Sequence, residues 1–398
     1  TMTDIKYFLA KETIDQADID ALCEWLQQKP MPRLTKGDLT LEFERKWADY
    51  IGTKYAVFCN SGSSANHLMV YAAMQAKKLR NKKIVVPSVG WVTTVSPAMQ
   101  FGLKPIMVGV DEKTFGINLD ELEEICKKEK PAIVIYVQVL GVPHHKERLL
   151  ELQKKYKFVL LEDACAALGA RYKDGTMVGK VGDMSSFSFY FGHQLSTIEG
   201  GMVNTDSKEL YDMLLMLRSH GWLKDLDQET YDKTIKEAGV NDFHKPFTFF
   251  VPGFNLRATD LQAFIGIRQV DKAEWVSKRR NENHIRYAEN LRGFVEFQDW
   301  GDNMPVSISF GALAASTEER TEIVKSLVAA GVENRIFSAG NLGKHPFWKN
   351  KYGEFNHPMS NRIHETGFFV PNDPTMTKED VDFISSVIIE ATKIRSNK

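Results

Sequence analysis

The stretch DMSSFSFYFGHQLSTIEGG, residues 183–201, carries the clearest local pattern in this chain. Aromatic residues alternate with smaller or polar ones along its first half, at Phe187, Phe189 and Phe191. This period of two is typical of a half-buried β-strand, so we predict a strand that ends at Gly192. His193 follows the strand. The paired glycines at 200–201 predict a sharp bend, or a place where the backbone comes very close to another group.

The segments on both sides of this stretch predict an α/β fold. Short apolar strands are expected at residues 55–58, 84–87, 105–108, 132–137, 158–161 and 202–203. Amphipathic helices are expected before and between them, at residues 13–29, 39–51, 120–128, 147–157 and 207–219. Nearly continuous apolar strands that alternate with helices are typical of a largely parallel sheet covered on both faces. The active sites of such sheets lie at the carboxyl ends of the strands.

The remainder of the chain predicts a second, smaller domain. Its expected elements are a long helix from Thr259 to Arg286, a strand at 305–310, and helices at 317–330 and 380–394. We therefore divide the chain into a large domain, residues 1–260, and a linking helix with a small C-terminal domain, residues 261–398. The highly charged residues 225–242 are expected to form a surface insertion.

The composition of the 398 residues is that of an ordinary globular protein, with 43% hydrophobic and 26% charged residues. The net charge of −1 gives no electrostatic reason to expect nucleic acid or an anionic membrane as a partner. No apolar run is long enough to span a bilayer, and the first residues form no signal segment. The four cysteines lack CxxC spacing and the histidines are isolated. We therefore expect no disulfide framework, no metal site and a cytoplasmic location.

The loop CNSGSSAN, residues 59–66, lies between a predicted strand and a predicted helix. A small-residue loop in that position can bind an anion, because unpaired N–H groups and the positive end of the helix dipole point at it. The expected donors are Ser61, Gly62, Ser63 and Ser64. The same residues also make a good N-cap and turn, so the pattern alone leaves both interpretations open.

Two further residues follow predicted strands. Asp163 lies at a strand end in the segment LEDAC, residues 161–165. A carboxyl group at a buried strand end needs a cationic partner or hydrogen bonds, although an N-cap for a following helix is the alternative. Trp91 follows the strand at 84–87, and its simplest interpretation is a core aromatic residue.

Residues 188–201 read S-F-x-x-x-H-x-x-x-x-x-E-G-G. This pattern resembles the cofactor-lysine segment of the DegT/DnrJ/EryC1/StrS family, sugar-modifying enzymes that use pyridoxal 5′-phosphate (PLP) and are mostly nucleotide-sugar aminotransferases. The lysine that carries PLP as a Schiff base in that family is replaced here by His193, and no lysine lies between Lys180 and Lys208. This departure is similar to the family's histidine branch, the 3-dehydratases of GDP-4-keto-6-deoxy-D-mannose. The resemblance covers nearly the whole chain.

The resemblance implies a fold and a cofactor site. The fold is that of PLP-dependent transferases of type I, with a mostly parallel seven-stranded sheet and a smaller C-terminal α+β domain. The residues implied to bind the cofactor are Gly62, Ser63, Ser64, Trp91, Asp163, Ser188 and Asn255. Among these, Trp91 would stack on the pyridine ring and Asp163 would pair with its protonated nitrogen. Together they would hold the ring as an electron sink without a covalent tether.

Two features of this site depend on a partner or on a departure from the family. The segment PGFNLR, residues 252–257, resembles the G-x-N-x-R turn of the family, whose members are homodimers with shared active sites. The resemblance implies that Asn255 reaches the cofactor phosphate of the neighbouring subunit.

Many relatives place a glutamine three residues after the aspartate, but this chain has Ala166 there. The contact to the cofactor O3′ atom is therefore unassigned.

Histidine changes the chemistry that the site can perform. An imidazole forms no stable Schiff base, but its unperturbed pKa of about 6.5 suits it to acid–base catalysis. The resemblance implies 3-dehydration of a nucleotide-linked 4-keto-6-deoxyhexose, with GDP-4-keto-6-deoxymannose as the expected substrate. L-glutamate would convert PLP to pyridoxamine 5′-phosphate (PMP), and His193 would serve as acid and base while the C3 hydroxyl leaves. The expected products are ammonia and a 3-deoxy-4-keto sugar of the kind built into lipopolysaccharide O-antigens.

Several alternatives stay open from the sequence. The chain could be a nucleotide-sugar 4-aminotransferase of the same family, or a lysine enzyme whose lysine has been exchanged for histidine. It could also be a ligand-binding protein that has the fold but no catalytic activity. An iron–sulfur variant of the histidine branch needs clustered cysteines, and the four here are dispersed. His67, His220 and Lys224 are considered for the sugar site, but no motif assigns them.

Overall fold

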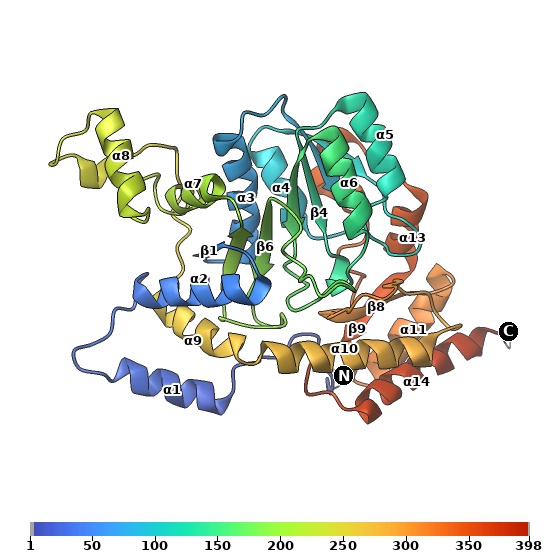
Figure 1. The fold of residues 1–398 in the computed structure, drawn as a ribbon. Helices are drawn as coiled ribbons and strands as arrows, with labels where there is room; N and C mark the ends of the chain where they lie inside the picture. The colour runs from blue at the N-terminus through green and yellow to red at the C-terminus, as the bar shows by residue number, and fades with distance from the viewer. Residues whose placement is uncertain (1–3, 397–398) are drawn as a thin grey trace.

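The structure, a computed structural model, describes residues 4–396. A seven-stranded sheet forms its centre, in the order β1-β7-β6-β5-β4-β2-β3 (Figure 1). The strands are β1 (Tyr55–Cys59), β2 (Lys83–Pro87), β3 (Lys104–Val108), β4 (Ile133–Val137), β5 (Val159–Asp163), β6 (Met184–Ser188) and β7 (Gly201–Thr205). Neighbouring strands are parallel except at β7, which is antiparallel to both β1 and β6. The structure confirms the predicted α/β fold with a mostly parallel seven-stranded sheet.

Helices cover both faces of the sheet (Figure 1). One face packs against α3 (Gly62–Ala76), α4 (Val92–Gln100) and α7 (Lys208–Arg218). The other face packs against α2 (Asp38–Ile51), α5 (Leu119–Glu129) and α6 (Lys146–Tyr156). Successive strand residues face opposite layers, so Val85 packs in the α5–α6 layer whereas Ile84 and Val86 pack in the α3–α4 layer. Each fully buried aliphatic side chain of this kind stabilises the fold by about 1.5–3 kcal/mol.

Helix α2 packs against the phenylalanine side chains of residues 187–189. Its residue Trp47 is fully buried and makes edge-to-face contacts with Phe187 and Phe189, with ring centres 5.1 and 5.0 Å apart. Strand β6 nevertheless ends at Ser188, so the predicted strand end at Gly192 is wrong. The aromatic alternation extends past the strand because both phenylalanine rings pack on Trp47. The chain continues beyond β6 as an irregular hairpin.

The C-terminal part contains a second, two-stranded sheet. Its antiparallel strands are β8 (Ser309–Leu313) and β9 (Gly367–Pro371), of which β9 is missing from the sequence prediction. The helices in this part are α10 (Ala273–Leu291), α11 (Thr317–Ala329), α12 (Pro346–Tyr352), α13 (Pro358–Thr366) and α14 (Lys378–Ser396). The strand predicted at 305–310 is wrong in position. Arg280 Nη1 binds the carbonyl oxygens of Ser307 and Ile308, each at 3.1 Å, and so withholds them from a strand ladder.

The single long helix predicted from Thr259 to Arg286 is two helices. Helix α9 (Asp260–Val270) ends before Lys272, and α10 begins directly after this residue. Lys272 N–H donates to the carbonyl oxygen of Gln269 at 2.9 Å, which is a tighter turn than an α-helix makes. The apolar pattern continues across this break, so periodicity alone does not reveal it.

Two helices lie outside these layers. Helix α1 (Gln16–Leu26) packs on α9, and α8 (Gln228–Ala238) lies in the charged insertion, away from the sheet (Figure 1). The predicted division between residues 260 and 261 falls at the start of α9 and stays a prediction. Within residues 4–396, no helix combines the length and the apolar character needed to span a bilayer.

A buried ion pair joins α2 to α7. Arg218 Nη1 lies 2.8 Å from Glu44 Oε2 and donates to Phe58 O at 2.9 Å. The arginine and glutamate side chains are only 1% and 5% exposed. Arg286 makes a contact of the same length with Asp382 at the surface, where the two side chains are 39% and 42% exposed. Arg218 also pairs with Asp225 at 3.4 Å, and Arg286 holds Asp382 through two hydrogen bonds. The pairs also differ in their access to water.

We expect Arg218→Leu to lower the free energy of unfolding by about 3–5 kcal/mol, because it leaves the Glu44 carboxyl group buried without its cation. Arg286→Leu is the matched control and should cost about 0–1 kcal/mol, because its ion pair is hydrated. Urea unfolding followed by circular dichroism measures both changes. Equal losses in the two variants would contradict this assignment.

Two buried histidines are held neutral by the fold. Burial lowers the pKa of His144 to about 4 and that of His284 to about 3. Unfolding returns each group to a pKa of about 6.5. The unfolded chain therefore binds more protons than the folded chain below pH 6.5. The stabilisation from these residues is complete above that pH and is lost as the pH falls towards the folded-state values.

Between pH 7 and pH 5, each of these two histidines should lower the free energy of unfolding by about 2 kcal/mol. His284→Gln should remove its own share of the change, because it deletes one titrating group. Urea unfolding at both pH values measures the effect, with His244→Gln at an exposed position as the control. A pH dependence that is the same in His284→Gln and in the wild type would refute the assignment.

Candidate active site

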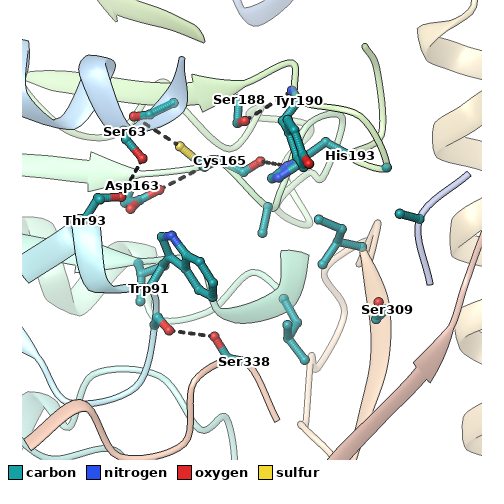
Figure 2. A pocket seen from close by; sticks show the side chains of 18 of the residues that line it. Ser63, Trp91, Thr93, Asp163, Cys165, Ser188, Tyr190, His193, Ser309 and Ser338 are labelled. Carbon is teal, nitrogen blue, oxygen red and sulfur yellow. Dashed lines mark hydrogen bonds between the residues drawn. The ribbon is translucent and has the colours of Figure 1, made fainter. Parts of the chain in front are cut away.

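A cavity of about 530 Å³ opens at the carboxyl ends of the strands, where the sheet meets the C-terminal part of the chain. Six of the eight residues predicted for the site line it: Gly62, Ser63, Trp91, Asp163, Ser188 and His193. Figure 2 shows Trp91, Asp163 and His193 around one open space. The parallel sheet thus brings together segments that lie far apart in the sequence.

Asp163 is the last residue of β5 and is only 3% exposed. Its Oδ2 atom accepts hydrogen bonds from Asn66 Nδ2 at 3.0 Å and from Thr94 Oγ1 at 2.6 Å. Its Oδ1 atom accepts one from Cys165 N–H at 3.0 Å. Residues 164–170 form no helix, so Asp163 is not an N-cap. Three donors therefore satisfy a buried acid that still lines the cavity.

The small-residue loop becomes the start of α3. Ser61 is the N-cap, and its Oγ atom accepts a hydrogen bond from Ser64 N–H at 3.0 Å. The Ser64 hydroxyl donates to Asn60 at 2.5 Å, so this side chain is used within the loop and does not line the cavity. The N–H groups of Gly62 and Ser63 are in the first turn and have no acceptor within the helix. They are the donors that remain for an anion.

Only glycine fits at position 62. A Cβ atom there would lie 2.7 Å from Ser188 Cβ and 3.0 Å from Cys165 Sγ. The neighbouring Ser63 hydroxyl donates to Thr93 Oγ1 at 3.0 Å (Figure 2). These contacts give a cradle in which a ligand can approach the backbone closely.

Trp91 is not a core residue. It precedes α4 and is 50% exposed, and it lines the cavity (Figure 2). The guanidinium carbon of Arg335 lies 5.7 Å from its ring centre. An indole that is half exposed in a cavity offers a flat apolar face, which suits stacking on a planar ligand. The interpretation of Trp91 as a core aromatic residue is therefore wrong.

His193 holds one ring nitrogen against the backbone and leaves the other for the cavity. Its Nδ1 atom lies 2.8 Å from Cys165 O (Figure 2). Because a carbonyl oxygen only accepts, Nδ1 carries the hydrogen of the neutral ring and Nε2 keeps its lone pair. Burial lowers the pKa of His193 to about 4, and the bond to Cys165 O opposes this effect. The ring is therefore a neutral base at pH 7.

The hairpin after β6 fixes the position of His193. Gly192 has a φ of 86°, a left-handed conformation that glycine adopts without strain, and a Cβ atom there would lie 2.5 Å from Ala10 Cβ. At the other end of the hairpin, a Cβ atom on Gly201 would lie 2.1 Å from Ser61 O. The close approach predicted for the glycine pair is therefore present, and its neighbour is the N-cap of α3.

Several predicted residues lie outside the cavity of this chain. Asn255 is exposed and pairs through its backbone with Ser219. The three residues considered for the sugar site also lie elsewhere: His67, His220 and Lys224. The Lys224 ammonium group lies 4.1 Å from the ring centre of Trp222. A single chain therefore does not bring these residues to the site.

Some residues of the site escape prediction from the sequence. Asn66 and Thr94 bind Asp163 from inside helices, where a polar residue is usually assigned to the surface. Helical spacing gives a usable signal, because Asn66 lies four residues after Gly62 and Thr94 lies three residues after Trp91. Each therefore shares a helix face or turn with its motif. Other unpredicted residues that line the cavity are Tyr190, Ser309, Arg335 and Ser338.

Residues 12–388 match the model of the DegT/DnrJ/EryC1/StrS aminotransferase family. The chain is 33% identical to the GDP-4-keto-6-deoxy-D-mannose 3-dehydratase of Yersinia pseudotuberculosis. The aligned 353 residues cover 87% of each protein. It also superposes on the E. coli GDP-4-keto-6-deoxy-D-mannose 3-dehydratase solved with bound hydrated PLP. That match has a TM-score of 0.87 and 27% identity, over 97% of this chain and 100% of the other.

A further solved GDP-4-keto-6-deoxymannose 3-dehydratase contains a trapped PLP–glutamate adduct. It superposes with a TM-score of 0.87 and 27% identity, over 96% of this chain and all of the other. These matches confirm the predicted fold of PLP-dependent transferases of type I. The family match extends over nearly the whole chain. The protein therefore belongs to the DegT/DnrJ/EryC1/StrS aminotransferase family.

Proposed function

We propose that this protein is a PLP-dependent dehydratase that removes the C3 hydroxyl group of a nucleotide-linked 4-keto-6-deoxyhexose. The proposed substrate is GDP-4-keto-6-deoxymannose and the proposed amine donor is L-glutamate, as suggested by the similar enzymes and their bound ligands. One observation carries the proposal. His193 lines the cavity with Nε2 free, in the segment where the family has its cofactor lysine.

The residues of the cavity fit PLP. The N–H groups of Gly62 and Ser63, with the Ser188 hydroxyl, would hold its phosphate, and Trp91 would stack on its ring. The Asp163 carboxylate would hold the pyridine nitrogen. Within residues 4–396 this buried carboxylate has neutral donors and no cationic partner, and a protonated pyridine would supply the missing cation.

The proton transfers would belong to His193. When bound, the cofactor supplies an electron sink that accepts the electron pair released at its C4′ carbon. His193 Nε2 would take the proton from C4′ as a base. The resulting imidazolium is a ready donor, because burial disfavours the charged ring. It would give the proton to the C3 hydroxyl oxygen, which would leave as water. The bond from Nδ1 to Cys165 O would keep the ring oriented.

The alternatives are less favoured. Net amine transfer in this family uses the lysine amine to protonate the sugar carbon, and His193 has no amine. A ligand-binding protein without catalytic activity would not need a base beside the cradle and the Asp163 carboxylate. Relatives named as 3-dehydratases cover 87% and 96% of this chain.

We further infer that the protein acts as a homodimer in a reducing cytoplasm. Asn255 is exposed and outside its own cavity, which suits contact with the cofactor phosphate of a second copy. Near it in sequence, Phe243 and Phe247 are 87% and 68% exposed, and clustered exposed aromatic residues often mark a contact surface. The four cysteines are free thiols, which suits a reducing compartment.

His193→Asn should lower the rate of dehydration by at least about 100-fold, because the proton at C4′ loses its acceptor. The affinity for the cofactor should be retained, since the cradle, Trp91 and Asp163 are unchanged. Initial rates of ammonia release measure the first effect, and titration of cofactor absorbance measures the second. His244→Gln is the control. Full activity in His193→Asn would show that another group moves the proton.

The proposed reaction also predicts a definite change in mass. The protein is incubated with PLP, L-glutamate and GDP-4-keto-6-deoxymannose, and the nucleotide sugar is weighed by mass spectrometry. We expect a product that lacks one oxygen atom, together with free ammonia, because the C3–O bond breaks. A product that carries a new amine group would instead establish the aminotransferase.

A further inference from the structure

The edge of the sheet opposite the cavity carries a concentration of positive charge. Four segments lie at the amino ends of the neighbouring parallel strands β2 to β5: residues 77–83, Lys104, residues 127–130 and residues 154–157. They contain twelve lysine and arginine residues and one glutamate, a net charge of +11 in a chain whose net charge is −1. Acidic residues elsewhere balance this surface, which we call the basic end, so the overall charge does not reveal it.

Hydrogen bonds between the segments hold the basic end together. Lys82 O accepts a hydrogen bond from Lys104 N–H at 2.7 Å, which joins the segments at β2 and β3. Arg80 Nη2 donates to Pro131 O at 3.1 Å and to Lys157 O at 2.8 Å. These bonds connect the first segment to those at β4 and β5. The positive side chains therefore project from one continuous backbone framework.

Most of the twelve cations have no carboxylate partner. Four form ion pairs at 2.6–3.5 Å, namely Lys77 with Glu209, Lys83 with Glu129, Lys127 with Glu124 and Lys155 with Glu123. The other eight have no carboxylate oxygen of residues 4–396 within 4.0 Å of their nitrogen atoms, and all eight are exposed: Lys78, Arg80, Lys82, Lys104, Lys128, Lys130, Lys154 and Lys157. The basic end therefore presents its excess charge to solvent.

Helix dipoles account for only part of this charge. Two lysines lie in the last turn of α5 and two in the last turn of α6, where cations are favoured. The other eight of the twelve cations lie outside the helices. Each helix end carries only about half a negative charge. The four helices that end here, α3 to α6, therefore offset about two positive charges, and most of the excess remains.

The composition of the basic end distinguishes among anionic partners. Eleven of its twelve cations are lysines, whose flexible point charges suit a diffuse anionic surface better than a planar recognition site. None of the large hydrophobic side chains in these four segments is exposed. Nucleic-acid bases and protein hot spots are commonly bound through exposed aromatic residues. A second copy of the same surface would repel it. These features favour a surface of anionic lipid headgroups.

We propose that the basic end binds the surface of a membrane that contains anionic phospholipids. Clusters of about four to eight lysine and arginine residues are sufficient for such binding, and each one near the surface strengthens it about fivefold. The contact is electrostatic and reversible, because no apolar side chain is available to insert. The cavity, at the carboxyl ends of the strands, faces away from the membrane and stays open to water. This inference does not depend on the proposed function.

The test is flotation of the full chain with lipid vesicles, which measures a partition coefficient. One set of vesicles is pure phosphatidylcholine, and the other contains about 30% phosphatidylglycerol, both in about 0.1 M salt. The basic-end variant carries four charge reversals at exposed positions: Lys82→Glu, Lys104→Glu, Lys130→Glu and Lys157→Glu. The matched control carries four reversals at exposed lysines on other surfaces: Lys113→Glu, Lys173→Glu, Lys349→Glu and Lys378→Glu. The two variants have the same net charge, and circular dichroism checks that both are folded.

Wild-type protein should bind the anionic vesicles but not the neutral ones. The basic-end variant should lower the partition coefficient by at least about 100-fold, because four attractive charges become repulsive. The control variant should lower it by less than about threefold, because charges far from the contact are screened at this ionic strength. Raising the salt to about 0.5 M should release the wild-type protein for the same reason.

Equal affinity of the wild-type protein for the two kinds of vesicle overturns the inference. An equal loss of binding in the two variants also overturns it, since net charge alone would then explain the effect. Competition experiments cover the other anionic partners. If poly(U) RNA or poly-L-glutamate displaces the protein from the vesicles at an equal concentration of negative charge, the basic end is assigned to RNA or to an acidic protein, and the lipid proposal fails.

Discussion

The buried carboxylate of Asp163 is the group on which the rest of the site depends. A buried acid has to be satisfied by hydrogen bonds or by a cation, and here Asn66 on α3 and Thr94 on α4 both donate to it. Asn66 lies one helical turn after the anion cradle at Gly62, and Thr94 lies one turn after Trp91. The bonds that satisfy the carboxylate therefore also fix the cradle and the aromatic ring relative to the sheet. The three proposed binding functions therefore share one set of hydrogen bonds.

The same segment positions His193, the proposed acid–base group. Cys165 donates its N–H to the Asp163 carboxylate and accepts a hydrogen bond from His193 Nδ1 at its carbonyl oxygen. The backbone of this one residue therefore fixes the imidazole relative to the carboxylate. The hairpin that carries His193 is closed against the N-cap of α3 by the contact of Gly201 with Ser61. Histidine provides no covalent tether for a cofactor. The non-covalent contacts then have to supply the whole of its orientation, which favours a rigid, shared framework over independent loops.

Sequence patterns predicted the sheet and most helices, because burial on both faces leaves a strong apolar periodicity. They failed where distant residues decide local structure. Arg280 moves the start of β8 by binding carbonyl groups about thirty residues away, and the turn at Lys272 divides a helix without interrupting its apolar pattern. At the site, motif residues such as Gly62 and Asp163 were predictable, whereas Arg335 was not. Its position beside Trp91 and Phe369 is recognised only when the fold is known.

Electrostatics sets the protonation state of the proposed acid–base group. Burial lowers the pKa of His193 to about 4; the cations of Arg280 and Arg335 add to this effect, and Asp163 opposes it. Burial is the largest of these causes and the charge of Arg335 is the smallest, so the enclosure of the ring decides its protonation state. General acid–base catalysis works best when the catalytic pKa lies near the working pH. At pH 7 the free protein therefore holds His193 below that optimum, as a neutral and weak base. In the proposed reaction the proton is therefore carried by a ring whose protonation state depends on its surroundings and not on a covalent bond to the cofactor.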